Sequence, residues 1–452
     1  SNASRGLGDV YKRQLLVLSV VLELSTVQVD YTAAFCQALL DHDVFITLPQ
    51  GWQRLNAMGL PEDFSEGKVL KLSKSLYGQK DAPRNWFLHL KERLERLGMK
   101  QSDHDPCLFI GADVICLVYV DDCLFFAPDQ SNIHKFIGKL KGLGMDLNIE
   151  DDVAGFLGLQ IKRLESGIVS LTQIGLIDRI LAAMGLDDSN PKLTPAPTQS
   201  LNKDINGTPF SQEFSYPSVI GMLLYLTQTR PEISFAVSQC ARYSHFPTMK
   251  HARYLKHIGR YLKHTRTKGL LLNPRKDASL DIQCYVDADF AGLWCPEDQS
   301  DPHSLKSRTG YVILIAGCPV IWKSKLQTLI AQSTMEAEYI ALSTAAKDIL
   351  PLQRLVGEVG KSLGVLKDSH TELLTTIWED NQACLKLASL ELPYMTNRSK
   401  HIALKYHWFR EYTASGQWKV KPIASCDQLG DLFTKGLGTE TFEKLRSYIM
   451  GW

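Results

Sequence analysis

The segment CLVYVDDCLFF, residues 116–126, places Asp121 and Asp122 between two runs of β-branched, aromatic and other apolar residues. Such runs favour strands, and aspartate tolerates the backbone conformations of a tight turn. The pattern therefore predicts a β-hairpin with both carboxylates at its tip. Taken alone, such a pair of aspartates is more often a solvated turn than a functional site.

Another acid lies in STVQVDYTAAF, residues 25–35, where Asp30 ends a β-like run that contains Val27 and Val29. A carboxylate in an otherwise apolar strand is costly to bury unless a charged partner meets it. If this strand neighbours the hairpin, Asp30 and Asp121 converge and can bind two divalent metal ions about 3.5–4 Å apart. Such ions would activate a primer 3′-hydroxyl and stabilise the leaving pyrophosphate.

The order of five segments resembles the reverse transcriptases of copia-type LTR retrotransposons. These segments are QVDYTAAF (28–35), SLYGQKDAPRNWF (75–87), YVDD (119–122), GFLGLQI (155–161) and a longer stretch at 216–243. The resemblance implies an α+β reverse transcriptase palm followed by a helical thumb or connection. It also implies that Asp30, Asp121 and Asp122 are the metal-binding catalytic carboxylates of a DNA polymerase.

The same resemblance assigns residues around the incoming nucleotide. Phe35, five residues after Asp30, matches the family's steric gate, whose ring would clash with a ribonucleotide 2′-hydroxyl; an ordinary core phenylalanine is the alternative. Gly78, Pro83 and Arg84 fall in the motif that shapes the nucleotide pocket and the template path. LPQGW at 48–52 resembles a retroviral pocket motif but precedes SLYGQK, so it is set aside.

Four further acids stand in separate predicted elements: Asp287 in CYVDADF, Glu336 in STMEAEYIAL, Asp380 in WEDNQA and Asp431 in DQLGDLFTK. Phosphodiester hydrolysis needs an activated water and a stabilised leaving 3′-oxygen, which two metal ions in a carboxylate cage provide. Each acid also has an ordinary explanation. Glu336 can form a capping box with Ser333, Asp380 can cap a helix that begins at Asn381, and Asp431 can lie on a solvated helix face. Judged singly, the ordinary explanations are favoured.

Together, these acids and their surroundings resemble the ribonuclease H region of the same family. SRTGYVILIAG, VIWKSK, STMEAEYIAL, EDNQA, RSKHIALKYHWFRE and LGDLFTKGL follow the family's order. The resemblance implies an α/β ribonuclease H-like domain, a mixed sheet flanked by helices. It assigns Asp287, Glu336, Asp380 and Asp431 as a catalytic, metal-binding tetrad, with Asp289 as a second candidate beside Asp287. Two Mg²⁺ or Mn²⁺ ions are expected at each of the two active sites.

Basic residues gather locally, although 50 Lys and Arg against 49 Asp and Glu leave a net charge of only +1. Residues 250–268 hold seven Lys or Arg and no acid, in a pattern typical of an amphipathic helix. A solvated surface, an acidic membrane and calmodulin are alternatives, but contact with a template–primer backbone is favoured. The expected contacts come from Arg253, Lys256, Arg260 and Lys263. A second cluster, expected to face the hybrid, contains Arg398, Lys400, His401, Lys405 and Arg410.

The expected organisation is a palm at 15–195, a thumb or connection at 196–279, a ribonuclease H-like domain at 280–440 and a tail at 441–452. Residues 1–14 resemble a purification-tag scar and a translated adaptor and are excluded. The apolar run after them predicts a buried helix, not a signal peptide or a membrane span. Because few residues then precede Asp30, the fingers are expected to be missing, and hybrid cleavage is expected to be more robust than polymerisation.

The expected function is RNA- and DNA-directed DNA synthesis coupled to degradation of RNA in RNA–DNA hybrids. Expected partners are an RNA template, a DNA primer, the hybrid and dNTPs, with no membrane, in a cytoplasmic virus-like particle or the nucleus. Capsid, protease and integrase segments would belong to the full element. A hybrid ribonuclease with a dead polymerase half and a non-catalytic, nucleic-acid-binding transposon fossil remain alternatives.

Overall fold

The computed structural model describes residues 13–47, 54–55, 61–62, 69–150, 158–164, 167–211, 213–275, 280–296, 301–366, 373–391, 394, 402 and 404–452. The chain divides into two compact units, which are treated separately below. The small unit is Ser25–Asp152, and the large unit is Ser1–Leu24 together with Val153–Trp452. The boundary at residue 152 lies well before the expected end of the palm at residue 195.

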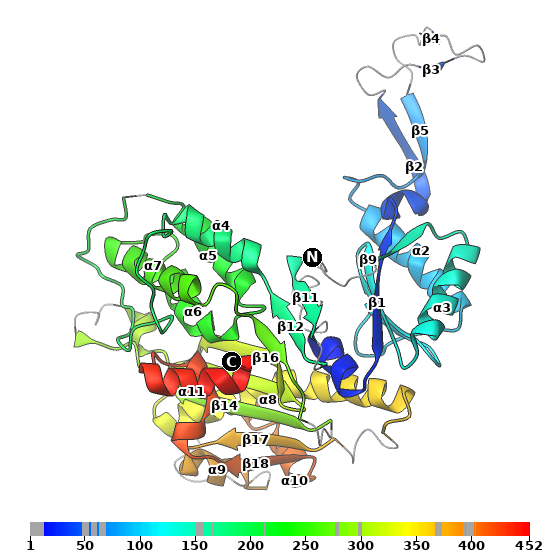
Figure 1. The fold of residues 1–452 in the computed structure, drawn as a ribbon. Coiled ribbons are helices and arrows are strands. Elements are labelled where there is room, and N and C mark those ends of the chain that lie inside the picture. Colours follow the sequence, from blue (N-terminus) through cyan, green and yellow to red (C-terminus); the bar gives the residue numbers. More distant parts are fainter. Residues whose placement is uncertain are drawn as a thin grey trace. The chain divides into compact units, whose positions relative to one another are not determined.

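The small unit is built on an antiparallel sheet of six strands in the order β10-β1-β9-β8-β7-β6. Helices α2 (Ala82–Arg96) and α3 (Gln130–Gly142) pack against this sheet (Figure 1). The pairing of β8 with β9 confirms the hairpin that residues 116–126 predict. The six strands are β1 (Ser25–Tyr31), β6 (Lys100–Gln101), β7 (Leu108–Ile110), β8 (Ile115–Tyr119), β9 (Asp122–Ala127) and β10 (Leu147–Glu150).

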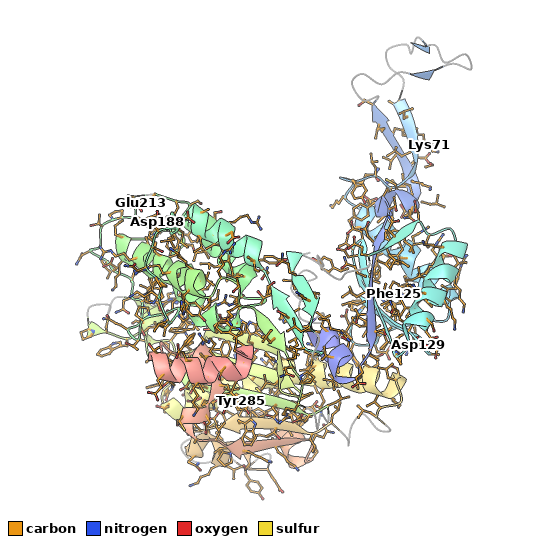
Figure 2. All side chains as sticks on the ribbon, viewed as in Figure 1. Lys71, Phe125, Asp129, Asp188, Glu213 and Tyr285 are labelled. Atoms are coloured by element: carbon orange, nitrogen blue, oxygen red, sulfur yellow. The ribbon has the colours of Figure 1, made fainter. Side chains whose placement is uncertain are left out.

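Alternation along β1 decides which way each of its side chains points. Val27 and Val29 are buried in the core of the small unit, together with Trp86 of α2 and Phe125 of β9, which Figure 2 labels. Successive residues of a strand point to opposite faces of the sheet. Asp30 therefore projects from the face opposite this core, where a charged group need not be buried among apolar side chains.

A two-stranded ladder extends from the small unit. Strand β2 (Leu39–Thr47) pairs antiparallel with β5 (Val69–Lys74), and Figure 1 shows both leading away from α2. The short strands β3 (Arg54–Leu55) and β4 (Pro61–Glu62) pair with each other. The LPQGW segment that was set aside in the sequence lies outside the described residues.

The large unit begins with a helical region and a small antiparallel sheet in the order β11-β12-β13. Strand β12 (Val169–Thr172) pairs with β13 (Leu270–Leu272), and α4 (Ile174–Ala183) packs on α5 and α7. These contacts bind residues 158–195 to the helices that follow, which is why the small unit ends before residue 195. The remaining elements here are β11 (Gln160–Arg163), α5 (Tyr216–Leu226), η3 (Pro231–Ile233), α6 (Ser234–Ala241) and α7 (Met249–His264).

A five-stranded sheet in the order β16-β15-β14-β17-β18 forms the second part of the large unit. Strand β14 (Ile282–Asp289) runs antiparallel to β15 (Arg308–Ile315) and parallel to β17 (Thr375–Glu379), and β17 runs parallel to β18 (Trp418–Pro422). The long helix α8 (Thr334–Ser362) packs on β14 and β15 (Figure 1). The mixed sheet flanked by helices is therefore confirmed. The other elements are η5 (Pro302–Leu305), β16 (Cys318–Leu326), α9 (Gln382–Ala388), η6 (Leu404–Tyr406), α10 (Arg410–Ala414), η7 (Ser425–Asp427), η8 (Leu429–Phe433) and α11 (Thr439–Met450).

Both chain ends that the sequence sets apart contribute to the large unit. Residues 13–21 are helical, and Arg13 lies 4.2 Å over the ring of Trp322 although it belongs to the excluded range 1–14. Residues 441–452, expected to be a tail, lie mostly in α11, where Phe442 meets Tyr261 of α7 edge-on at 5.7 Å. Of the helices described here, none combines the length and the apolar character needed to cross a bilayer.

Candidate active sites

The three predicted polymerase carboxylates come together at one end of the small unit's sheet. Asp30 is the cross-strand partner of Asp122, and Tyr119 pairs with Asp122 to close a two-residue turn of Val120 and Asp121. Carboxylates directly opposite each other on paired strands repel, so this arrangement favours a cation between them. The sequence predicted that Asp30 converges with Asp121; the strand register places Asp30 opposite Asp122, and Asp121 lies in the adjoining turn.

The turn that carries Asp121 is conformationally strained and held from two sides. Val120 has a φ of 57°, a left-handed conformation that is rare for a β-branched residue. Its carbonyl accepts a hydrogen bond from Trp86 Nε1, and the carbonyl of Asp121 accepts one from the Tyr31 N–H at 3.3 Å. Backbone strain of this kind persists when surrounding contacts over-determine it, and it is frequent at functional sites. The turn is therefore a fixed platform for the two aspartates.

Phe35 and an unpredicted aromatic residue stand beside these acids. Phe35 lies in η1 (Ala34–Gln37), partly buried against the core, with its ring centroid 4.6 Å from that of Tyr77. Burial, together with the carboxylates of Asp121 and Asp30, raises the pKa of the Tyr77 hydroxyl. Tyr77 precedes Gly78, whose φ of 94° is readily available only to glycine. The adjacency to Gly78 was the sequence signal that could have identified Tyr77.

Pro83 and Arg84 lie in the first turn of α2, where proline fits because its missing N–H is not needed. Close by, the Nδ1 of His42 is 2.6 Å from Asp41 and its Nε2 is 3.5 Å from Asp81. The hydrogen bond from His42 lowers the pKa of Asp41, and Arg84 adds to this effect. Because Asp41, His42 and Asp81 are solvated and pair with one another, we interpret them as a surface ion-pair cluster.

In the large unit, three acids bring carboxylate oxygens within 4.8 Å of one another: Asp287, Glu338 and Asp380. Asp287 lies near the carboxyl end of β14, and Asp380 directly follows the parallel neighbour β17. Parallel strands end at the same edge of a sheet, so the two acids meet there. Asp287 and Glu338 are buried, and such a cluster is costly without a positive partner.

Glu338, not Glu336, completes this triad, which corrects the predicted position. Glu336 takes the alternative role of a helix-end residue: its main-chain N–H donates to Ser333 Oγ at 3.2 Å, and its carboxylate accepts from the Gln332 N–H at 2.7 Å. Glu338 lies on the buried stripe of α8 that continues through Ala341, Leu342, Ala345 and Ala346. This helical spacing marks the face of α8 that packs on the sheet. It indicates Glu338, whereas the capping motif directed the prediction to Glu336.

The electrostatics of the triad fit a divalent cation. Burial, with Glu379, Asp287 and Asp380 nearby, raises the pKa of Glu338 to about 11. Burial likewise raises the pKa of Glu379, a further acid that the sequence did not single out, to about 8. Within the described residues, Glu338 Oε2 and Glu379 Oε2 are buried without a hydrogen-bond partner. Clustered, incompletely satisfied carboxylates are suited to Mg²⁺ or Mn²⁺, which prefer oxygen ligands.

Asp431 reaches the same site from η8. Gly430 allows the close approach, because a Cβ at this position would lie 2.8 Å from the Asp287 Cβ. Gln428 fixes the segment by donating to the Val286 carbonyl at 2.9 Å. Burial and the neighbouring Asp287 raise the pKa of Asp431 to about 7, against the opposing effect of Lys435. Asp431 is thus part of the acidic cluster, as predicted, and is not a solvated helix face.

Asp380 is not the cap of the following helix. Asn381 takes that role, since its Oδ1 accepts the N–H groups of Ala383 and Cys384, each at 3.0 Å. Asp380 instead receives the Ser425 hydroxyl at 2.7 Å and lies with Asp287 and Glu338. Asp289, the second candidate, is half-buried two residues after Asp287, and burial raises its pKa. It does not belong to the described triad.

The raised pKa values predict a pH dependence of the metal-free chain. Acids whose pKa is higher in the folded state bind more protons when the chain is folded. Their contribution to the free energy of unfolding is therefore complete below about pH 4 and is lost as the pH rises. For Asp431 and Glu379 the loss runs through about pH 7 and about pH 8. The melting temperature of the large unit, followed by calorimetry with a chelator, should therefore fall between pH 5 and pH 8.5.

The matched variant for this experiment is Glu379→Gln, which removes one titrating group and should flatten the profile. A group whose pKa differs by two units between the folded and unfolded states changes the free energy of unfolding by roughly 2.7 kcal/mol. The difference between the profiles of the parent and the variant is therefore measurable. Addition of Mg²⁺ should flatten the parent profile as well. A melting temperature that is constant or rises over this interval in the parent chain would contradict the prediction.

Most of the basic residues predicted on α7 are engaged within the chain. Lys256 pairs with Glu213 at 2.7 Å, Lys263 donates to the Ser189 carbonyl at 2.9 Å, and Arg260 donates to the Asn190 carbonyl. The contacts of Lys263 and Arg260 hold the segment before residue 195 against α7. Arg253 is exposed, and its contact with nucleic acid stays a prediction.

The second basic cluster is only partly described. Arg398, Lys400 and His401 lie outside the described residues. Lys405 is exposed beside the ring of Tyr406. Arg410 is fully buried and donates to the carbonyls of Leu390, Glu391 and Tyr394, each at 2.8 Å, so it holds the fold and does not face a ligand. Of this cluster, Lys405 is the described residue still available for a hybrid.

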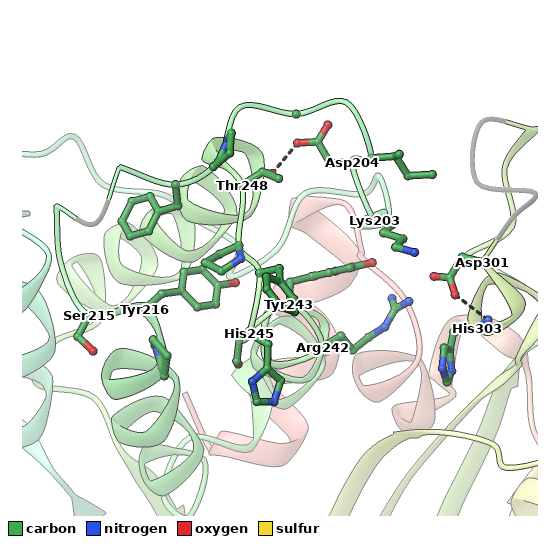
Figure 3. A pocket seen from close by; sticks show the side chains of 18 of the residues that line it. Lys203, Asp204, Ser215, Tyr216, Arg242, Tyr243, His245, Thr248, Asp301 and His303 are labelled. Carbon is green, nitrogen blue, oxygen red and sulfur yellow. Dashed lines mark hydrogen bonds between the residues drawn. The ribbon is translucent and has the colours of Figure 1, made fainter.

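A cavity of about 1290 Å³ lies elsewhere in the large unit, lined by residues from 203–217, 242–248 and 301–303 together with Leu326 (Figure 3). Its two acids have partners within its walls. Asp204 accepts the Thr248 hydroxyl at 2.5 Å, and Asp301 accepts the His303 N–H at 3.0 Å. None of the predicted catalytic acids is among these lining residues. The cavity is therefore separate from the carboxylate clusters.

Comparison with known proteins bears on the family of the chain. Residues 10–198 match the family described as reverse transcriptase (RNA-dependent DNA polymerase). The retrovirus-related Pol polyprotein from transposon RE1 of Arabidopsis thaliana is 32% identical over 443 residues, which are 96% of this chain and 28% of that protein. The one from transposon TNT 1-94 of Nicotiana tabacum is 30% identical over 450 residues, 97% of this chain and 32% of that protein. Among solved structures, LC11-RNase H1 isolated from compost covers 37% of this chain and 98% of its own, with 15% identity and a TM-score of 0.25.

Residues 10–198 thus form a reverse transcriptase region. Along most of its length the chain is a homologue of the Pol polyproteins of copia-type retrotransposons, as its motifs predict. It spans 28% of the length of the RE1 relative and 32% of the TNT 1-94 relative.

Proposed function

We propose that the chain combines an RNA- and DNA-directed DNA polymerase in the small unit with an RNA–DNA hybrid ribonuclease in the large unit. Both would be phosphoryl-transfer sites that use two Mg²⁺ or Mn²⁺ ions. Similarity to Pol polyproteins over most of the chain supports the pairing of these activities. The observation that carries the proposal is the triad of Asp287, Glu338 and Asp380, of which the first two are buried, extended by Asp431, because such a cluster is costly without a cationic partner.

For the ribonuclease, Asp287, Glu338, Asp380 and Asp431 would hold the ions. When bound, the ions would lower the pKa of a water molecule and stabilise the leaving 3′-oxygen. The protein's part is to position these ligands. The edge of the sheet fixes Asp287 and Asp380, α8 supplies Glu338, and η8 brings Asp431 to them. Ser425 orients Asp380 through its hydroxyl.

For the polymerase, Asp30, Asp121 and Asp122 would hold the ions that bind a dNTP and the primer end. Phe35 and Tyr77 form an aromatic pair beside these acids, suited to contact the sugar of the nucleotide and to exclude a 2′-hydroxyl. Gly78, Pro83 and Arg84 would shape the adjacent pocket. An RNA template and a DNA primer are the proposed partners, within a cytoplasmic virus-like particle.

Binding of the nucleic acid would depend on exposed basic residues. Arg253 and Lys405 are the predicted contacts that remain solvent-exposed in the described part of the chain. Contacts to phosphates position a duplex without reading its sequence and weaken as salt rises. Lys256, Arg260 and Lys263 would act mainly by supporting the α7 surface.

The test is to digest a labelled RNA–DNA hybrid and to extend a primed RNA template with one preparation, with and without Mg²⁺. Both activities, each dependent on the metal, are the expected result. Cleavage without extension would favour a ribonuclease with an inactive polymerase half. Absence of both from a folded preparation that still binds the hybrid would favour a non-catalytic binding protein.

A further inference from the structure

We propose that Lys435 is a built-in counter-ion that occupies the position between Asp287 and Asp431, so that a divalent ion can bind there only by displacing it. The two metal-ion positions of the ribonuclease site would then fill one after the other. The position formed by the triad would fill first, and the position that Lys435 occupies would fill second. This inference rests on the proposed ribonuclease function and concerns the order in which its site is assembled.

The geometry places the ammonium group between the two acids. Lys435 Nζ lies 2.8 Å from Asp431 Oδ1 and 3.8 Å from Asp287 Oδ2. The same Asp287 oxygen accepts the hydroxyl hydrogen of Thr434. Both carboxylates are therefore neutralised on this side by groups of the chain itself. The contact with Asp431 Oδ1 is an ion pair, so a divalent ion that used these oxygens would compete with the charge of the ammonium for the same two carboxylates.

The lysine is held here by local structure and can still leave. Its main-chain N–H donates to the Asp431 carbonyl at 3.3 Å, which keeps it one helical turn after that acid. Its side chain is 45% exposed, whereas the side chains of Asp287 and Asp431 are 5% and 9% exposed. The flexible stem can therefore swing the ammonium into water, while the acids stay fixed in the site.

The other side of Asp287 is different. There Glu338 and Asp380 share the position with Asp287, and within the described residues Glu338 Oε2 has no hydrogen-bond partner. An incoming cation meets three carboxylates at this position and no ammonium bonded to Glu338. Asp287 belongs to both positions, so a metal ion bound at one position changes the metal affinity of the other. The factor of this change is the same in both directions. Because the triad offers three carboxylates, with no ammonium bonded to Glu338, it should bind a metal ion more tightly than the pair formed by Asp287 and Asp431.

The experiment measures Mn²⁺ binding to the full chain by calorimetry and electron paramagnetic resonance, without nucleic acid. Lys435→Met keeps the apolar stem and removes the charge, and Lys435→Arg keeps the charge. Lys444→Met is the matched control, because Lys444 pairs with Asp427 at 2.7 Å outside the cluster. Mn²⁺ binding at the weaker position should strengthen about tenfold in Lys435→Met. It should stay as in the parent in Lys435→Arg and Lys444→Met.

A second readout separates this role from simple stabilisation. The metal-free Lys435→Met chain should melt at a lower temperature than the parent and should gain more from added Mn²⁺. Unchanged Mn²⁺ affinity in Lys435→Met, or an equal gain in Lys444→Met, would overturn the proposal. Glu338→Gln tests the underlying site. If it weakens Mn²⁺ binding while Lys435→Met does not alter it, the metal site stands and the counter-ion role fails. If Glu338→Gln leaves binding intact, the proposed metal site itself fails.

Discussion

Glu338→Gln should lower the rate of hybrid cleavage at least about a hundredfold, the typical effect of losing one strong electrostatic stabiliser from an active site. Glutamine keeps the shape of the side chain but removes the charge that would hold a metal ion. The variant should nevertheless fold well. Its parent carboxylate is buried with a pKa raised to about 11, so replacement should raise the melting temperature of the metal-free chain near pH 8.

Glu336→Gln is the matched control, since it lies two residues away on the same helix. Glutamine also serves in a capping box, so this variant should keep its fold and cleave hybrid within a few-fold of the parent. The comparison measures both variants at saturating Mg²⁺ with a labelled hybrid. If Glu336→Gln were inactive and Glu338→Gln active, the sequence-based assignment would be restored and the triad would be structural.

The second large effect is expected in the small unit. Asp121→Asn should abolish primer extension while leaving hybrid cleavage within a few-fold of the parent, because the two carboxylate sets lie in separate units. Loss of one strong electrostatic stabiliser alone accounts for at least about a hundredfold. Asparagine is tolerated in tight turns, so the hairpin between β8 and β9 should keep its shape.

Asp129→Asn controls for a loss of charge in the same unit. Asp129 caps α3 by accepting the Ser131 N–H at 2.8 Å, and asparagine caps helices about as well. This variant should retain extension. Primer extension on a short RNA template and digestion of the hybrid are measured side by side. Equal loss of both activities in a folded Asp121→Asn chain would refute two independent sites.

The local signals that succeeded were those with a single physical meaning. The hairpin at 116–126 follows from strand alternation and turn preferences, which depend on neighbouring residues. The sequence predicted Asp121 as the residue that meets Asp30, whereas the register places Asp122 opposite it. Glu336 and Glu338 show the limit. Ser333 and Glu336 form a helix start, whereas the apolar spacing that includes Glu338 marks the face of α8 that packs on the sheet, and the capping motif drew attention away from that second signal.

Other differences arose from long-range contacts. Proline and glycine between residues 187 and 215 indicate either a linker or a loop that follows the surface, and the contacts of Lys263 and Arg260 favour the second of these. Charges that seemed available for nucleic acid are used within the chain. Residues 441–452 look like a tail until Phe442 is seen against Tyr261. Pairings of this kind join positions far apart in the chain, and a single sequence carries no signal for them.

The pairing of β12 with β13 limits how related elements can exchange parts. The two strands must match in register, Val169 opposite Leu272, although about a hundred residues separate them. Recombination anywhere between them would combine strands inherited from different parents. A crossover at residue 152 keeps both strands and the helices α4 to α7 from one parent, while residues 13–24 of the same unit come from the other. Functional chimaeras should therefore be found most often with a crossover near residue 152. The domain border that the sequence predicts near residue 195 should be a poor crossover point.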